Sequence, residues 1–170
     1  MAAGFRCVTA SANEVSMMAA KAARGAGAPP EQAAEFGKAA LMHLIAGRPA
    51  EDIETALAAL PTGPILDLPV AIRRTLETAQ EATATLLLPK EPPAPLFLSY
   101  LEAQPFAVER AGEDQIVLHL KVPAAPMSIL RVHPPNWLWA QMSDLARQIL
   151  VPDTAASRAA GAGAGQIDND

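Results

Sequence analysis

The alternation of apolar and polar positions divides the chain into three parts. Residues 11–82 repeat their apolar positions with spacings of three and four, as amphipathic helices do, whereas residues 83–133 show mainly the every-second-residue alternation of strands. Residues 134–170 carry one further helical stripe and then a run of glycine and alanine. The pattern therefore predicts a single α+β domain over residues 1–170, with an N-terminal bundle of three to four helices, a small antiparallel sheet, a C-terminal helix and a glycine-rich tail.

The first helix is predicted over residues 12–23, where the apolar positions fall on one face. Ser11 or Asn13 can cap its start, because both side chains can accept a hydrogen bond from an unpaired N–H of the first turn. Gly25 or Gly27 can end it in the left-handed conformation.

Three more helices are expected before the strands. Proline in the first turn and glycine past the last turn bound two of them, over about residues 29–47 and 49–60. Small residues around Gly37 allow a neighbouring helix to approach closely. Pro61-Thr62-Gly63-Pro64 is interpreted as the end of the third helix, and a fourth helix is predicted over residues 68–81.

The β part is predicted to hold several short strands joined by turns. Ala111-Gly112-Glu113-Asp114 lies between two alternating runs and is interpreted as a hairpin loop. The predicted strand residues are Leu96, Leu98 and Tyr100, then Phe106 and Val108, then Ile116, Leu118, Leu120 and Val122, and finally residues 127–132.

A last helix is expected after Pro134-Pro135-Asn136, with Asn136 as its cap. Trp137 is assigned to the core. The inward stripe of this helix comprises Leu138, Met142, Leu145 and Ile149.

Composition narrows the classes of function. Aromatic residues make up 4% of the chain and hydrophobic residues 51%, which predicts a core of aliphatic side chains and close alanine contacts. The net charge is -5 and the 13 basic residues are scattered, which argues against nucleic acid as a partner. A single cysteine, Cys7, excludes an intrachain disulfide and favours a cytoplasmic location. No run of 18 apolar residues occurs, so no membrane partner is expected.

No catalytic constellation can be recognised. His43, His119 and His133 show no metal-ligand spacing to one another or to acidic residues, so no metal site is predicted. No Gly-x-Ser-x-Gly sequence is present to support a serine nucleophile. The sequence assigns no catalytic residue and leaves any cofactor unknown.

Two segments combine a basic residue with alternating glycine and alanine. The first contains Arg24, Gly25 and Gly27, and its simplest interpretation is the corner that ends a helix. The second is the tail, which has three interpretations: a segment held in a narrow groove or against a partner, a solvated end, or oxygen ligands for a cation. Its candidate ligand-binding residues are Arg158, Gly161, Gly163, Gly165, Asp168, Asn169 and Asp170.

These same segments carry a resemblance. Asn13-Glu14-Val15 and Lys21-Ala22-Ala23-Arg24-Gly25-Ala26-Gly27, together with Val151-Pro152-Asp153-Thr154 and the run from Ser157-Arg158 to Asp168-Asn169-Asp170, resemble a bacterial family catalogued only as a domain of unknown function. The chain departs from the family pattern at Gln166-Ile167, where Leu-Thr is usual, and at Leu150, where tyrosine is frequent. The resemblance implies that the two glycine segments act together, and it brings no activity with it.

A weaker similarity concerns residues 15–40, which look like the N-terminal helices of malate/lactate dehydrogenase-type oxidoreductases. The Ser-His-Gly stretch that those enzymes carry downstream is absent. We therefore interpret this similarity as a shared pattern of helix corners.

Two hypotheses follow. In the first, the chain is a non-catalytic cytoplasmic binding or accessory protein that uses its glycine-rich tail to contact a protein partner or a second copy of itself. In the second, it is an enzyme or a protein that binds a small anionic metabolite, with Arg24 and the N–H groups near Gly25 and Gly27 facing the anion and the tail completing the site.

Overall fold

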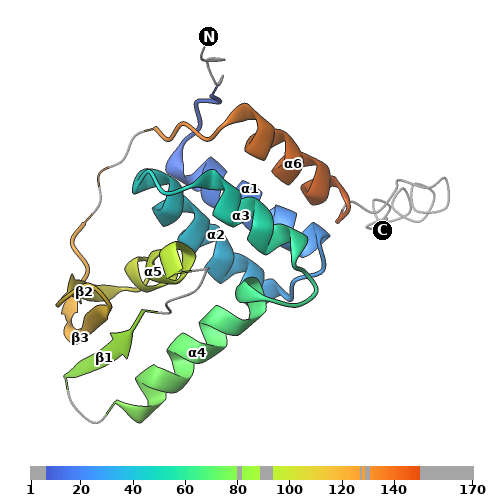
Figure 1. The fold of residues 1–170 in the computed structure, drawn as a ribbon. Coiled ribbons are helices and arrows are strands. Elements are labelled where there is room, and N and C mark those ends of the chain that lie inside the picture. Colours follow the sequence, from blue (N-terminus) through green and yellow to red (C-terminus); the bar gives the residue numbers. More distant parts are fainter. Residues whose placement is uncertain (1–6, 80–81, 89–93, 127, 129–130, 150–170) are drawn as a thin grey trace, which may run out of the picture.

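The computed structural model describes residues 7–79, 82–88, 94–126, 128 and 131–149. Within them the chain forms the predicted α+β fold, in which a helical bundle lies beside a small antiparallel sheet (Figure 1). The elements in chain order are α1 (Ala12–Gly25), α2 (Pro30–Ile45), α3 (Ala50–Ala58), α4 (Pro64–Thr78), β1 (Thr83–Leu87), α5 (Ala94–Glu102), β2 (Phe106–Arg110), β3 (Gln115–Pro123) and α6 (Asn136–Arg147).

Helix α1 begins and ends where its sequence signals predict. The Ser11 hydroxyl accepts from the N–H of Glu14, and the Glu14 carboxylate accepts from the N–H of Ser11, which together make a capping box. Gly27 follows the helix with a φ of 102°, so it supplies the predicted left-handed turn. The other predicted stop, Gly25, is the last residue of the helix itself.

Helix α2 lies in the centre of the bundle and contacts α1, α3, α4 and α5. Its buried face includes Phe36, Ala39 and Ala40. A Cβ atom on Gly37 would overlap the carbonyl oxygen of Ser16, so the absence of a side chain lets α1 and α2 approach closely. The close approach predicted around Gly37 is confirmed.

The boundary between α3 and α4 differs from the prediction. Pro64 begins α4 rather than ending α3, and the predicted start at residue 68 is therefore too late. Proline suits the first helical position because its missing N–H would have no partner there. Gly63 precedes it with a φ of 82°, which turns the chain between the two helices.

The strand predicted at Leu96, Leu98 and Tyr100 is wrong, because these residues belong to helix α5. The helix buries Leu96 and Phe97 in one turn and Tyr100 and Leu101 in the next. This spacing of one and four is that of a helix face, and the face packs on α2.

Three strands form a sheet in the order β1-β3-β2, with both pairs antiparallel. The strands predicted at Phe106–Val108 and Ile116–Val122 are confirmed, as is the hairpin loop at residues 111–114. Ile116 and Leu118 point into the core. Of the strand predicted over residues 127–132, positions 127, 129 and 130 lie outside the described residues, and Val132 makes an isolated bridge to Ala10 away from the sheet.

Helix α6 packs on α1 and lies on the side of the bundle opposite the strands (Figure 1). The prediction that Asn136 caps it is wrong: Pro135 occupies the cap position, and Asn136 is the first helical residue. Leu138 and Met142 are buried as predicted, but Ile149 follows the helix and is 38% exposed. None of the helices in the described part of the chain is long and apolar enough to cross a membrane.

Candidate functional site: a groove between α1 and α6

Helices α1 and α6 run side by side in the same direction. Trp139 near the start of α6 lies with Asn13 and Glu14 near the start of α1, and Gly25 at the end of α1 lies against Leu145 near the end of α6. Backbone bridges between Ala10 and Val132, and between Cys7 and Pro135, hold together the segments that lead into the two helices. The carboxyl ends of both helices therefore lie at the same end of the pair.

The contact at Gly25 sets how closely the helices approach. A Cβ atom at this position would overlap the carbonyl oxygen of Leu145, so no larger residue fits without moving α6. Gly25 was a candidate ligand-binding residue, and the structure shows that it has a packing role.

Two adjoining depressions follow the line between the helices, with volumes of about 280 and 250 Å³. They share Met18 and Lys21, so we treat them as one surface and call it the α1–α6 groove. Its lining residues are Asn13, Glu14, Met17, Met18 and Lys21 from α1 and Trp139, Ser143, Ala146, Arg147 and Ile149 from α6 and the residues after it.

The groove exposes apolar side chains to solvent. Met17 is 49% exposed and Ile149 is 38% exposed, and the other two large apolar side chains exposed in the described chain, Leu87 and Val122, belong to the sheet. Methionine is unbranched and polarisable, so it adapts to ligands of different shape. An apolar ligand would therefore bury surface here that water now covers.

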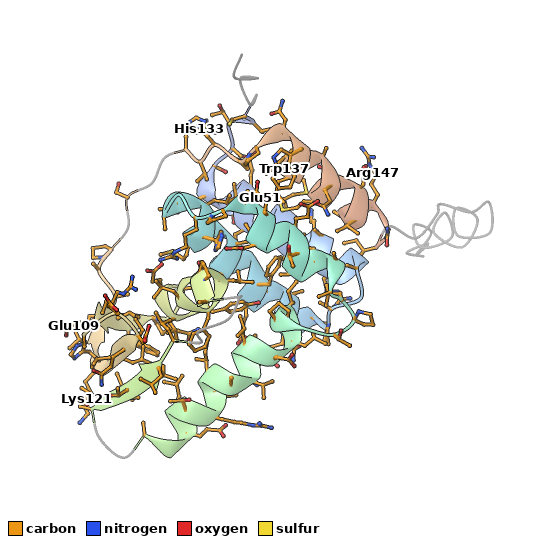
Figure 2. The ribbon with its side chains drawn as sticks, in the orientation of Figure 1. Glu51, Glu109, Lys121, His133, Trp137 and Arg147 are labelled. Atoms are coloured by element: carbon orange, nitrogen blue, oxygen red, sulfur yellow. The ribbon has the colours of Figure 1, made fainter. Side chains whose placement is uncertain are left out.

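Basic side chains gather where the carboxyl ends of the two helices meet. Lys21 and Arg24 are exposed and are neighbours on one face of α1, and within the described part of the chain neither makes an ion pair. Arg147 pairs with Asp144 at 2.6 Å, and both side chains are largely exposed. Figure 2 shows Arg147 at the end of α6 away from Trp137. These cations complement the negative ends of the two helix dipoles and leave positively charged side chains exposed at this end of the groove.

The corner from Arg24 to Gly27 was predicted to offer N–H groups to an anion. The N–H of Gly27 donates to the carbonyl of Arg24 at 3.1 Å. Likewise, the N–H groups of Ala26 and Ala28 donate to carbonyls within α1, at 2.9 and 2.8 Å. These three donors already have partners, so the exposed Arg24 guanidinium is the candidate group of this corner for an anion.

The remaining candidate residues belong to the tail. Arg158, Gly161, Gly163, Gly165, Asp168, Asn169 and Asp170 all lie outside the described residues. The structure therefore does not test whether they meet the Arg24–Gly27 corner.

A larger depression, of about 360 Å³, lies elsewhere, beside His133. It is lined by Leu44, Ile45, Arg131, Val132 and His133. None of the strongly exposed apolar side chains contributes to it, and its lining includes one arginine, Arg131, whereas the groove is lined by two basic residues, Lys21 and Arg147. The α1–α6 groove is the better candidate because it combines exposed apolar surface with charge.

A buried polar cluster, which the sequence analysis missed, joins α2, the start of α3 and α5. His43 is fully buried; its Nε2–H donates to the carbonyl of Pro49 at 2.8 Å, and its Nδ1 lies 2.9 Å from the Ser99 hydroxyl. Arg48 donates to Ser99 at 2.7 Å and holds the Glu102 carboxylate through two hydrogen bonds of 2.6 and 2.7 Å. The only sequence signal was a set of polar residues within apolar runs.

The cluster has the residue types of a nucleophilic site but not its accessibility. Ser99 and His43 are both completely buried, so a substrate cannot reach the hydroxyl. Burial lowers the pKa of His43, and the hydrogen bond to Pro49 and the Asp52 carboxylate oppose this effect. The Ser99 hydroxyl lies 2.9 Å from both His43 Nδ1 and the carbonyl of Pro95, to which it donates. The cluster therefore connects three elements, and we assign it a structural role.

The described residues contain no group of three or more histidine, cysteine, aspartate or glutamate side chains that could hold a metal ion. His119 pairs with Glu109 at 2.8 Å on the sheet, and His133 lies 3.3 Å from the Thr9 hydroxyl. The histidines therefore lie in three separate environments.

No family model, no curated protein and no solved structure matches the chain. The assignment of function consequently depends on the geometry of the groove.

Proposed function

We propose that this chain is a cytoplasmic, non-catalytic binding module whose α1–α6 groove holds an extended segment of a partner protein. The partner segment combines apolar side chains with acidic ones. The single observation that carries the proposal is the exposure of Met17 and Ile149 in a groove that has Lys21 and Arg147 among its lining residues. The sequence assigned binding to the glycine-rich tail, and the proposal adds the groove as the receiving surface beside it.

The size of the groove supports a short peptide. From Asn13 to Lys21, the lining residues of α1 that lie farthest apart, the helix rises by about 12 Å, at about 1.5 Å per residue. An extended peptide rises by about 3.3 Å per residue, so about four residues cover this length. Apolar residues would lie along the methionines and Trp139, and acidic residues would lie at the end with Lys21 and Arg147.

The experiment is a selection of random peptides displayed on phage against the full-length chain. The selected peptides are then titrated against the unchanged chain, Met17→Asp and Leu87→Asp. Both substitutions place a carboxylate on a strongly exposed apolar position, but Leu87 lies in β1, across the bundle from α6 (Figure 1).

We expect Met17→Asp to weaken binding by about tenfold or more, because the new charge replaces apolar contact and repels acidic peptides. Leu87→Asp should leave the affinity unchanged. A library that yields no binding peptide, or peptides that bind Met17→Asp as tightly as the unchanged chain, would refute the proposal.

A second candidate is the small-anion site at the Arg24–Gly27 corner completed by the tail. The exposed Arg24 guanidinium favours it, and the engaged N–H groups of Ala26, Gly27 and Ala28 weaken it. Inorganic phosphate should then raise the melting temperature of the full-length chain, and Arg24→Ala should abolish the rise. The absence of any rise with the unchanged chain would contradict this candidate.

The relation to the bacterial family of unknown function stays a prediction. It implies that the two glycine segments act together.

A further inference from the structure

We propose that the end of this chain, a short stretch within residues 158–170, occupies the α1–α6 groove of the same molecule and so competes with the partner segment. The proposal rests on the proposed function, because it assigns an occupant to the same groove. It also specifies the order of the groups in the partner segment, in which an apolar side chain precedes the acidic ones, as Ile167 precedes Asp168 and Asp170 in the tail.

The described part of the chain ends beside the groove. Ile149 is its last residue and lines the groove next to Lys21 and Arg147. Residues 150–157 then connect the groove wall to the proposed occupant. A segment tethered close to a site has an effective concentration of the order of millimolar where its connection lets it reach the site, so contacts with a dissociation constant below about 1 mM are populated.

The negative charge of the tail complements the positive charge at one end of the groove. The tail carries Asp168 and Asp170, separated by one residue. Lys21 and Arg24 are exposed cations that make no ion pair within the described part of the chain. Arg147 adds a third cation at the same end, and its exposed pairing with Asp144 is weak enough to exchange. The two carboxylates therefore complement the basic end of the groove.

The small side chains of the tail suit the small volume of the groove. Residues 159–165 have side chains no larger than a methyl group, and the aliphatic Ile167 follows them, two residues after Gly165. The depressions of the groove are small, about 250 and 280 Å³, and Gly25 allows the two helices to lie close together at one end of it. A backbone without large side chains can approach such a surface, and Ile167 offers one apolar side chain to the methionines beside the acidic pair.

The test uses the full-length chain with the photoreactive residue benzoyl-phenylalanine at position 17 or, as a matched control, at position 87. Both positions hold exposed apolar residues, and only position 17 lies in the groove. After irradiation, mass spectrometry identifies the residues that have been joined. We expect adducts between position 17 and residues 158–170 of the same molecule at a yield about tenfold above that from position 87, because the tail is bound beside position 17 and meets position 87 only by diffusion.

A second measurement avoids altering the groove. Asp168→Asn with Asp170→Asn should tighten the binding of a library-selected peptide by about fivefold, because the competing tail loses its ion pairs. Asp153→Asn removes a carboxylate from the same part of the chain but outside the proposed occupant, and it should leave the affinity unchanged.

The outcomes separate this inference from the proposed function. If selected peptides bind the groove but the tail gives no adduct and its carboxylates do not affect affinity, the tail proposal fails and the binding module remains. Adducts that join two different molecules would also overturn it, because they assign the groove to a second copy. If neither peptides nor the tail bind at position 17, both proposals fail.

Discussion

Gly25 of α1 lies directly against the main-chain carbonyl of Leu145 in α6. A residue with a Cβ atom would overlap that oxygen, so the two helices can lie this close only with glycine at position 25. The contact fixes the spacing of the groove walls at their basic end.

Gly25→Ala should therefore lower the free energy of unfolding by about 1 to 3 kcal/mol, as overpacking of a close contact does. Urea denaturation of the unchanged chain and the variant measures this. Gly112→Ala is the control, because a Cβ atom there meets nothing closer than 4.0 Å, and it should change stability by less than about 0.5 kcal/mol. Equal stability of Gly25→Ala and the unchanged chain would show that α6 does not pack against α1 in this way.

The paired side chains of Arg48 and Glu102 should contribute measurably to stability. Their shortest contact is 2.6 Å, and Arg48 is 15% exposed, so solvent screens the pair only in part. In a double-mutant cycle with Arg48→Met and Glu102→Gln, we expect a coupling energy of about 1 to 3 kcal/mol.

The pair of Arg147 and Asp144 is a control of equal length. Its contact is also 2.6 Å, but both side chains are at least 70% exposed. The corresponding cycle should give a coupling energy close to zero, since exposed pairs contribute little. Similar coupling in the two cycles would mean that burial does not strengthen the pair of Arg48 and Glu102.

Stability should fall on acidification because of His43. Burial lowers the pKa of His43 in the folded chain below the value of about 6.5 that it has when unfolded. As the pH falls through this value, the unfolded chain gains a proton that the folded chain does not bind. The stability that the folded chain gains from a neutral His43 is therefore complete above pH 6.5. Below that pH the free energy of unfolding decreases by at most about 1.4 kcal/mol per pH unit, until the lower pKa of the folded state is reached.

Urea denaturation between pH 7.5 and 5.5 tests this, with His43→Gln for comparison. The variant is less stable at every pH because it loses the ring that connects Pro49 and Ser99, but its stability should depend less on pH in this range. An equal pH dependence in the two proteins would contradict the effect of burial on His43.

Charge reversal in the groove should weaken peptide binding. Lys21→Glu is expected to lower the affinity for a library-selected acidic peptide by about five- to tenfold at low salt, with a smaller effect at high salt because ions screen exposed charges. Lys121→Glu on β3 makes the same change on the sheet, far from α6 (Figure 2), and should have no effect. Calorimetric titration at two salt concentrations measures both; equal losses would mean that only net charge matters.

Local signals predicted those parts of the fold that depend on neighbouring residues. Ser11 and Glu14 cap α1, and Gly27 ends it, because these roles need only residues within one or two turns. The strand predicted in the run from Leu96 to Leu101 was wrong, because nearly every residue there is apolar and the pattern fits both the strand period and the helix period.

The buried polar cluster and the α1–α6 groove are formed by contacts between segments that are distant in the sequence, and no local sequence pattern predicts such contacts. His43 meets Ser99 across 56 positions of sequence. The groove likewise needs Met17 from one end of the described chain and Trp139 from the other. The packing role of Gly25 could not be predicted, because a glycine near a basic residue suits both an anion site and a helix crossing, and only the position of Leu145 shows the crossing.

The walls of the α1–α6 groove are separated along the chain by all of residues 26–135. During synthesis on a ribosome, α1 emerges long before α6. Until α6 has been made, the buried face of α1 at Ala19, Ala22 and Ala23 is only partly packed against other residues. A nascent chain therefore has no groove, and a partner that binds the groove distinguishes finished molecules from unfinished ones.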